Sequence, residues 1–258
     1  MIEGKETLQV EHFLLTRFNL ERNSPTPKDW LKLRIKLFET YCLPSIEAQN
    51  QKLFYWLLLF NPKTEREIFP YIEKWQKRVP TIVPAWCIKG EGIGGCVMPF
   101  IKKIIKENEA THVITSRLDN DDALHPNFMK AVRQYSVKLI HSPEGLSDNK
   151  RGVALQFPSG YRYLEKKQRL YKWTRPHNPF LSLLRRADMP TFKTVHSFPE
   201  SHGSIWKYVQ VHTVSNKLYW LQVLHDTNIT NALGRKREKI VSKFNKTEFD
   251  YLLGRKVE

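Results

Sequence analysis

The segment His112-Val113-Ile114-Thr115-Ser116-Arg117-Leu118-Asp119-Asn120-Asp121-Asp122 joins an apolar stretch directly to an acidic cluster. Its first seven residues predict a buried strand over 112–118. In open α/β sheets, ligands bind beyond the carboxyl ends of the parallel strands. The acidic cluster, residues 119–122, therefore stands where a ligand site is expected.

Apolar stretches before this strand alternate between strand-like and helix-like patterns. The predicted strands cover residues 12–18, 53–60 and 81–87. The predicted helices cover residues 30–41, 67–77 and 97–105, with Pro44 beyond the end of the first, a loop at 23–27, and a further helix opened by Pro126. This alternation predicts a parallel sheet with right-handed crossovers.

The pattern changes after residue 140, where short strands joined by tight turns become frequent. They are predicted at 153–157, 161–164, 169–173, 208–214 and 219–224, and a basic surface helix is predicted over 235–246. We expect one α/β domain over 1–258. It comprises a Rossmann-like, mostly parallel sheet flanked by helices (about 10–140), an antiparallel extension (about 141–234) and a basic tail (235–258).

Composition and charge limit the class of protein. A hydrophobic content of 41% and an aromatic content of 12% exclude intrinsic disorder, and the net charge of +16 implies an anionic partner. No apolar run is long enough to span a bilayer and no signal peptide is recognisable, so a cytoplasmic protein is expected.

Cys42, Cys87 and Cys96 show no CxxC spacing and are expected to be reduced, buried thiols. The basic residues Arg235, Lys236, Arg237 and Lys239 suit peripheral contact with anionic lipid at the inner face of a membrane.

Two interpretations of the acidic cluster follow from its residues alone. Asp119, Asp121 and Asp122 repel one another unless a cation or hydrogen bonds offset their charge, and hard oxygen ligands suit a divalent ion. The alternative is an Asx-rich turn that caps the helix after Pro126. The metal-binding interpretation is favoured over the turn.

The cluster also resembles the D-x-D segment of nucleotide-sugar glycosyltransferases of the GT-A type. Together with residues 12–19 (HFLLTRFN), 38–46 (FETYCLPSI), 56–60 and 220–228 (WLQVLHDTN), it is similar to the bacterial family of putative rhamnosyl transferases. The resemblance extends over about 10–232. It implies a GT-A-like fold and an enzyme of the hexosyltransferase type, which moves a sugar such as rhamnose from a nucleoside-diphosphate donor to a glycan or lipid-linked acceptor in surface polysaccharide assembly.

The same resemblance implies a role for particular residues. Asp119 and Asp121 would hold Mn²⁺ or Mg²⁺, with His225 as a further ligand and Asp122 orienting the donor sugar or helping to hold the metal. A hydrogen-bonded histidine at a strand end is the alternative for His225. Thr16 and Arg17 would lie near the donor nucleotide, where Arg17 could pair with a phosphate. Arg117 would pair with either the acidic cluster or the donor, and Asp119 would also contact the donor. Asn61 stands where many relatives of the wider class place an aspartate that holds the base, which leaves base recognition open.

An inverting transferase also needs a general base opposite the leaving group. Residues 196–203 (HSFPESHG) offer Glu200 and His202, with Asp188 ranked behind them, and a polar loop is the alternative. A retaining enzyme needs no such base.

Aromatic side chains are frequent after the acidic cluster and can pack against sugar rings. They are Tyr161, Tyr163, Tyr171, Trp173, Trp206, Tyr219 and Trp220. Trp173 and Trp206 are expected at the rim of an acceptor site, whereas Trp220 is assigned to the core.

Two other functions compete with glycosyl transfer. They are a Mg²⁺-dependent nuclease or phosphotransferase with a basic nucleic-acid-binding surface, and a non-enzymatic basic binding module. No sequence-specific nucleic-acid motif is present, so no specific nucleic acid is expected as a partner.

Overall fold

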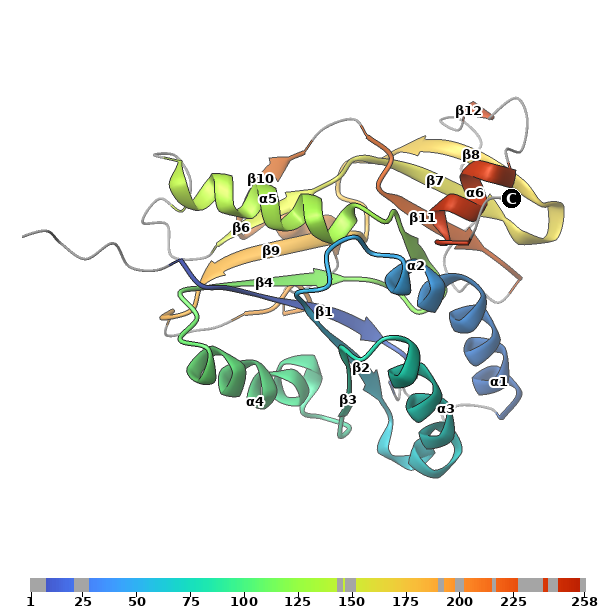
Figure 1. Ribbon diagram of the computed structural model, residues 1–258, viewed down its shortest axis with the longest axis horizontal. Coiled ribbons are helices and arrows are strands. Elements are labelled where there is room, and N and C mark those ends of the chain that lie inside the picture. Colours follow the sequence, from blue (N-terminus) through green and yellow to red (C-terminus); the bar gives the residue numbers. More distant parts are fainter. Residues whose placement is uncertain are drawn as a thin grey trace, which may run out of the picture.

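Two β-sheets and the helices around them make up the fold seen in the computed structural model (Figure 1). The structure describes residues 8–20, 28–142, 146, 152–189, 193–197, 202–214, 217–226, 239–240 and 246–255. The loop predicted at 23–27 and the basic residues 235–237 lie outside these ranges.

The larger sheet has seven strands in the order β10 (Gln210–Thr213), β6 (Val153–Gln156), β9 (Leu181–Arg186), β4 (His112–Arg117), β1 (Val10–Arg17), β2 (Tyr55–Phe60) and β3 (Ile82–Trp86). Only β9 runs against its neighbours β4 and β6, and the other neighbouring pairs are parallel. The smaller sheet has the order β12 (Lys239–Ile240), β8 (Arg169–Thr174), β7 (Ser159–Leu164), β11 (Trp220–Leu224) and β5 (Ala123–Leu124).

The predicted α/β class with a mostly parallel sheet is confirmed, but the division of the chain differs in detail. β6, β9 and β10 come from the second half and extend the main sheet, and β9 had no counterpart among the predicted strands. Every residue of β6 is buried, so its sequence lacks the alternation of polar and apolar residues that would indicate which sheet it joins. In the smaller sheet the β7–β11 pair is parallel, while the other pairs are antiparallel as expected.

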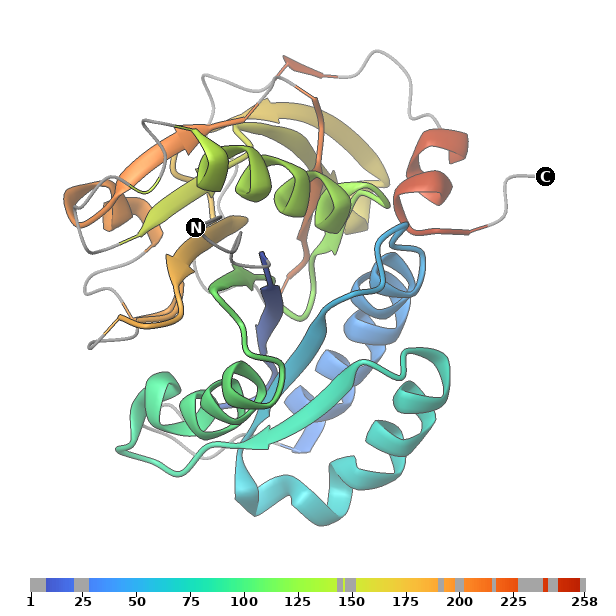
Figure 2. The same ribbon diagram turned by 60° about the vertical axis from the view of Figure 1, so that its left-hand side comes forward.

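Helices cover both faces of the main sheet (Figure 2). They are α1 (Lys28–Leu37), α2 (Leu43–Glu47), α3 (Glu65–Arg78), α4 (Gly92–Glu107), α5 (Phe128–His141) and α6 (Lys246–Leu252). One core joins alternate strand residues such as Leu14 and Trp56 to α1, α2, α3 and α5. The opposite core joins Phe13 and Leu57 to α4. The central strands β1 and β2 thus bury both of their faces, as central parallel strands require.

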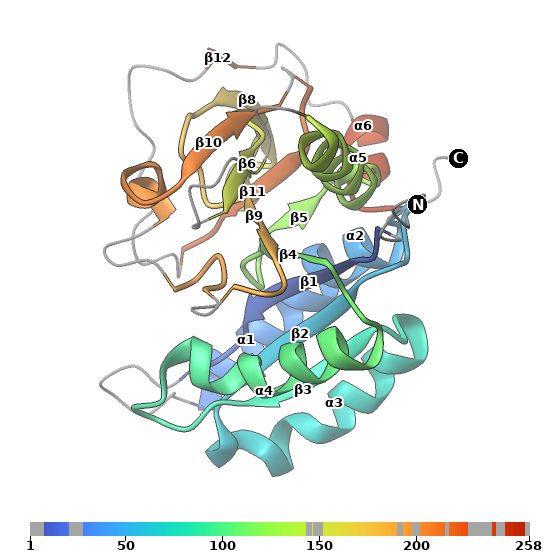
Figure 3. The same cartoon turned by 90° about the vertical axis from the view of Figure 1, so that its left-hand side faces the viewer.

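Two predicted helix boundaries are wrong. Pro44 lies in the first turn of α2 instead of beyond the helix end, because a π-helical turn over Phe38–Cys42 joins α1 to α2 and changes the hydrogen-bond pattern just before it. The expected helix over 235–246 is also wrong where the structure describes the tail. Within its described part, 239–240 pair with β8 and the helix α6 begins at Lys246. Figure 3 shows α6 in the half of the molecule that holds the smaller sheet, where Phe249 and Leu252 pack against Tyr163 and Leu37.

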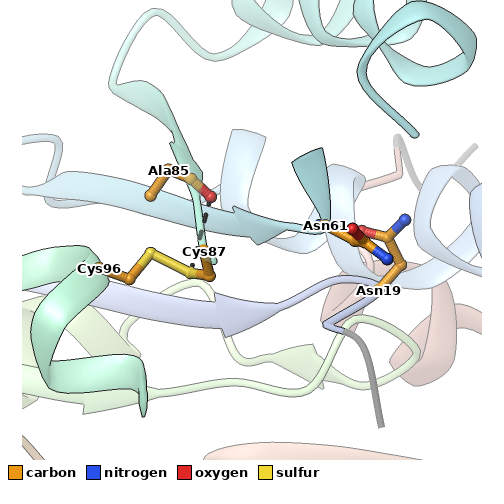
Figure 4. Close-up of a disulfide and its surroundings, with 5 residues drawn as sticks. All are labelled: Asn19, Asn61, Ala85, Cys87 and Cys96. Carbon is orange, nitrogen blue, oxygen red and sulfur yellow. Dashed lines mark hydrogen bonds between the residues drawn. A yellow bond between two sulfur atoms is a disulfide. The ribbon is translucent and has the colours of Figure 1, made fainter. Parts of the chain in front are cut away.

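The expectation of three reduced cysteines is also corrected. Cys87 follows β3 and Cys96 lies on α4, and a disulfide joins them with their Cα atoms 5.0 Å apart (Figure 4). The strand-to-helix turn folds the chain back on itself, which the linear spacing does not reveal. Cys42 is a buried free thiol, as predicted. The cysteines therefore no longer support a reducing compartment.

No helix within the described ranges is long and apolar enough to cross a membrane.

A buried polar chain links three central strands of the main sheet. His12 Nε2 on β1 contacts Ser116 Oγ on β4 at 2.7 Å, and Ser116 Oγ lies 2.6 Å from Ser182 Oγ on β9. Burial, with a smaller contribution from the charge of Arg133, lowers the pKa of His12 to about 3. The imidazole is therefore neutral in the folded protein at physiological pH.

This pKa shift makes stability depend on pH with a definite sign. The unfolded chain takes up a proton at His12 near pH 6.5, whereas the folded chain does so only near pH 3, so stability falls as the pH drops between these values. Moving from pH 7 to pH 5 should cost about 2 kcal/mol through His12. Urea unfolding at both pH values should show that His12→Asn removes about this much of the wild-type difference.

His141→Asn, which changes an exposed histidine of α5, serves as the control. If the free energy of unfolding of His12→Asn depended on pH as that of the wild type does, His12 would have the same pKa in the folded and unfolded states.

Candidate functional site

The acidic cluster lies at the carboxyl edge of the main sheet, where the chain passes from one sheet to the other. β4 ends at Arg117, the cluster follows, and β5 then pairs with β11 of the smaller sheet. The residues of the cluster are therefore fixed from both sides. This is the edge at which the sequence predicts a ligand site.

Two arginines meet at Asp119. Arg117 Nη2 donates to Asp119 Oδ2 at 2.8 Å, and Arg17 Nη2 lies 3.5 Å from Asp119 Oδ1. Burial would raise the pKa of Asp119, but the charges of Arg117 and Arg17 outweigh it and hold the pKa below its ordinary value. Arg117 thus contacts the acidic cluster, one of the two partners expected for it, and about 30% of the Asp119 side chain stays exposed. Contact of Arg17, Arg117 and Asp119 with a donor nucleotide stays a prediction.

Asp121 is enclosed by a residue that the sequence reasoning missed. Arg34 Nη1 on α1 donates to Asp121 Oδ2 at 2.5 Å, and His225 Nε2 lies 2.8 Å from the same oxygen. The sequence did hold a signal for Arg34, which stands three residues after Leu31 and four before Phe38, both of which are buried. An arginine on the buried side of an amphipathic helix needs a partner in the interior. This contact is the one expected of the alternative, a hydrogen-bonded histidine at a strand end, and metal ligation by His225 stays a prediction.

Asp122 and Asn120 tie the cluster to its surroundings. Asp122 Oδ1 accepts the backbone N–H of Val223 on β11 at 2.9 Å, and Asn120 Nδ2 donates to the backbone oxygen of Phe18 at 2.8 Å. Burial raises the pKa of Asp122 well above its usual range, and the Asp121 and Asp119 charges add to this effect. Asp122 thus joins the two sheets through this hydrogen bond, and its contact with a donor sugar or a metal stays a prediction.

The side chains of Thr16 and Asn61 form hydrogen bonds with other residues of the protein. Thr16 is fully buried and its hydroxyl accepts the indole N–H of Trp56 at 2.9 Å, so the predicted contact with a nucleotide is corrected. Asn61 Oδ1 accepts the backbone N–H of Lys63 at 3.0 Å, and the backbone N–H of Asn61 is bound by Asn19 Oδ1 at 3.1 Å (Figure 4). Asn61 therefore holds the turn after β2, and base recognition stays open.

The structure places one of the three predicted general bases and describes little of the other two. Asp188 forms an exposed ion pair with Arg186, which pairs in register with His112 at the opposite end of β4, so Asp188 is too far from the cluster to act there. Glu200 lies outside the described residues, and of His202 only its place at the start of the short 3-10 helix His202–Lys207 is described. Both stay predictions.

His196, from the same predicted loop, does reach the cluster. Val195 beside it donates its backbone N–H to Thr115 Oγ1 on β4 at 2.9 Å. Within the described part of the chain, His196 Nε2 is buried and has no hydrogen-bond partner. Burial, then the charges of Arg117 and Arg17, lower the pKa of His196 to about 3, so its ring is neutral at physiological pH.

The aromatic residues divide into core and surface. Trp220 is fully buried against Phe180 and Trp173, as predicted. Trp173 is also buried, beneath the guanidinium group of Arg162 at 3.4 Å from its ring centroid, so its predicted place on a rim is wrong. Trp206 is 54% exposed, as a rim residue should be.

The residues as arranged do not form a metal-binding set. Within the described ranges, no three histidine, cysteine or acidic side chains are grouped closely enough to hold an ion. The oxygens of Asp119 are bound by Arg117, and Asp121 Oδ2 by Arg34. The Mn²⁺ or Mg²⁺ site on Asp119, Asp121 and His225 stays a prediction from the sequence.

Comparison with known sequences identifies the family. The family model described as "Putative rhamnosyl transferase" matches residues 17–237. The chain therefore belongs to this family of glycosyltransferases, which confirms the resemblance seen in the sequence and the predicted class of enzyme. No protein of curated function matches the chain.

Solved structures resemble this chain only weakly. Structures of residues 1–349 of Staphylococcus aureus TarS, alone and in complex with UDP, share 12% identity with a TM-score of 0.45 over 83% of this chain. This chain covers 60% of those structures. A 4-diphosphocytidyl-2C-methyl-D-erythritol synthase shares 11% identity with a TM-score of 0.36 over 80% of this chain and 90% of that one.

The burial of Asp121 makes its replacement costly for folding as well as for function. Asp121→Asn leaves the buried Arg34 guanidinium without a counter-ion, and breaking a buried pair in this way costs about 3 kcal/mol or more. Urea unfolding should show this loss of stability together with loss of transferase activity. The matched control is Asp226→Asn, which removes the exposed pair with Lys166 and should change stability by less than about 1 kcal/mol. Equal stability of the two variants would contradict the importance of the buried pair.

Proposed function

We propose that this member of the family transfers a glycosyl group from a nucleoside-diphosphate sugar to an acceptor hydroxyl, with the donor diphosphate at the acidic cluster. The observation that carries the proposal is the pair of guanidinium groups, Arg17 and Arg117, at the carboxyl edge of the parallel strands β1 and β4. Guanidinium groups match phosphate oxygens in charge and geometry, and partly exposed ones can turn towards a ligand. About 35% of the Arg17 side chain is exposed.

The chemistry expected at this edge follows from charge. Cleavage of the donor's glycosidic bond leaves a diphosphate with added negative charge, and preorganised cations stabilise that charge as it develops. Asp119 holds the two guanidinium groups in place before the donor arrives. A GT-A-type donor half, formed by β1 to β4 with α1, α3 and α4, agrees with this placement.

The finer parts of the proposal concern the sugar and the acceptor. The family description supports rhamnose as the transferred sugar, and a glycan or a lipid-linked glycan as the acceptor would place the enzyme in surface polysaccharide assembly. The net charge of +16 supports peripheral contact with an anionic membrane or an anionic glycan. Family membership favours glycosyl transfer over the nuclease alternative.

Donor binding can be measured directly. Calorimetric titration with UDP, dTDP and GDP should identify one nucleotide that binds, and Arg117→Met should weaken its binding about tenfold or more because a charge-assisted contact is lost. Arg186→Met is the matched control. It removes the same kind of i,i+2 pair with an aspartate, at the opposite end of the sheet, and should bind as the wild type does. Equal effects of the two substitutions would place the diphosphate elsewhere.

The acceptor side yields a second test. Trp206 is an exposed aromatic side chain on the 3-10 helix His202–Lys207, whose Ile205 anchors the segment in the α4-side core. Trp206→Ala should raise the KM for the acceptor about tenfold while leaving hydrolysis of the donor nearly unchanged, since stacking on a sugar ring is lost. Phe69→Ala on α3 changes a similarly exposed aromatic residue and serves as the control. A fall in donor hydrolysis equal to the acceptor effect would refute the assignment.

A further inference from the structure

The acidic cluster is surrounded by cations that belong to the protein. Arg17 on β1 and Arg117 on β4 bind Asp119, and Arg34 on α1 binds Asp121. The three guanidinium groups balance the three carboxylates of residues 119–122 in formal charge. They reach the cluster from different elements, so the fold itself supplies the positive charge that closely packed acids require.

Arg34 is the most firmly held of the three. It is 7% exposed, its guanidinium carbon lies 5.0 Å from the centroid of the Trp30 ring, and its Nη1 also donates to Asn120 Oδ1 at 3.3 Å. Its main contact, at 2.5 Å, is with Asp121 Oδ2. A cation held by an ion pair, a hydrogen bond and an aromatic ring in the interior is expensive to move.

The position of Arg34 conflicts with a metal ion on Asp121. The oxygen that Arg34 binds is the one that His225 Nε2 also contacts, so an ion held by Asp121 and His225 through these atoms would have to displace the buried guanidinium group. Displacement would leave Arg34 charged and without its carboxylate in a closed space. The arrangement already provides at this point what a metal would provide, a fixed positive charge beside the carboxylate.

We infer that Arg34 is a positioning residue that takes the place of a divalent cation on Asp121, so that nucleoside diphosphates bind to this enzyme without metal. The inference rests on the proposed function and deepens it. Arg34 cancels the charge of Asp121, so Arg17 and Arg117 face the diphosphate without that negative charge beside them. Without Arg34 the cluster gains a negative charge and repels the same ligand.

The test measures nucleotide affinity with and without metal. The dissociation constant of the nucleotide that binds best among UDP, dTDP and GDP is determined calorimetrically in EDTA, and again in Mg²⁺ or Mn²⁺. For the wild type we expect values within about threefold of each other. For Arg34→Met we expect binding about tenfold weaker in EDTA, and recovery in Mn²⁺ because Asp121 and His225 are released for the ion.

Two further variants separate positioning from folding. Arg34→Lys keeps the charge and should retain most of the affinity in EDTA. Arg78→Met removes an arginine paired with Glu47 before the start of β3, at the opposite edge of the sheet, and should behave as the wild type. If Arg34→Met does not fold, the wild type in EDTA and Arg34→Lys still decide the question.

Each result has one meaning. Wild-type binding that is lost in EDTA and restored by Mn²⁺ overturns the inference and leaves the proposed function standing. Wild-type binding in EDTA that Arg34→Met does not weaken also overturns the role of Arg34. Absence of nucleotide binding in every condition refutes the proposed function itself, and the inference with it.

Discussion

Buried carboxylates must find partners, and this requirement at residues 119–122 fixes how the main parts of the molecule meet. Asp119 is bound from β1 and β4, Asp121 from α1 and from the residue after β11, and Asp122 from the backbone of β11. Each partner lies far from the cluster in sequence or on another element, so satisfying the charges also aligns the elements. Removing one carboxylate leaves a buried arginine or N–H group without its partner, and a buried polar or charged group without a partner destabilises the fold.

The two cores around the main sheet make this arrangement rigid. Residues that alternate along β1 and β2 bury one face against α1, α2, α3 and α5 and the other against α4. Arg34 reaches the cluster on a helix of the first core, whereas Arg117 reaches it from the end of a central strand. The cations therefore reach the acids from different elements of the fold, which keeps the guanidinium groups apart.

Much of the site could be predicted because its signals are local. Three aspartates after an apolar run, with arginines at the ends of β1 and β4, indicate a ligand edge in any parallel sheet. The residues that sequence reasoning misassigned depend on distant contacts. The Thr16 hydroxyl is hydrogen-bonded to Trp56, and Trp173 is covered by Arg162. Arg34 was overlooked because its helical stripe looked apolar and its partner lies 87 residues further along the chain.

The sequence by itself determined the α/β class, most strands and helices of the first half, the acidic edge and the family, because hydrophobic periodicity and short motifs act over neighbouring residues. Tertiary structure alone decided that β6, β9 and β10 extend the main sheet, that Cys87 and Cys96 form a disulfide, and that Arg34 binds Asp121. These outcomes depend on which segments come together in space. The sequence of a strand that is buried on both faces does not show which strand pairs with it. In the same way, a cysteine or an arginine does not show which distant residue it will bind.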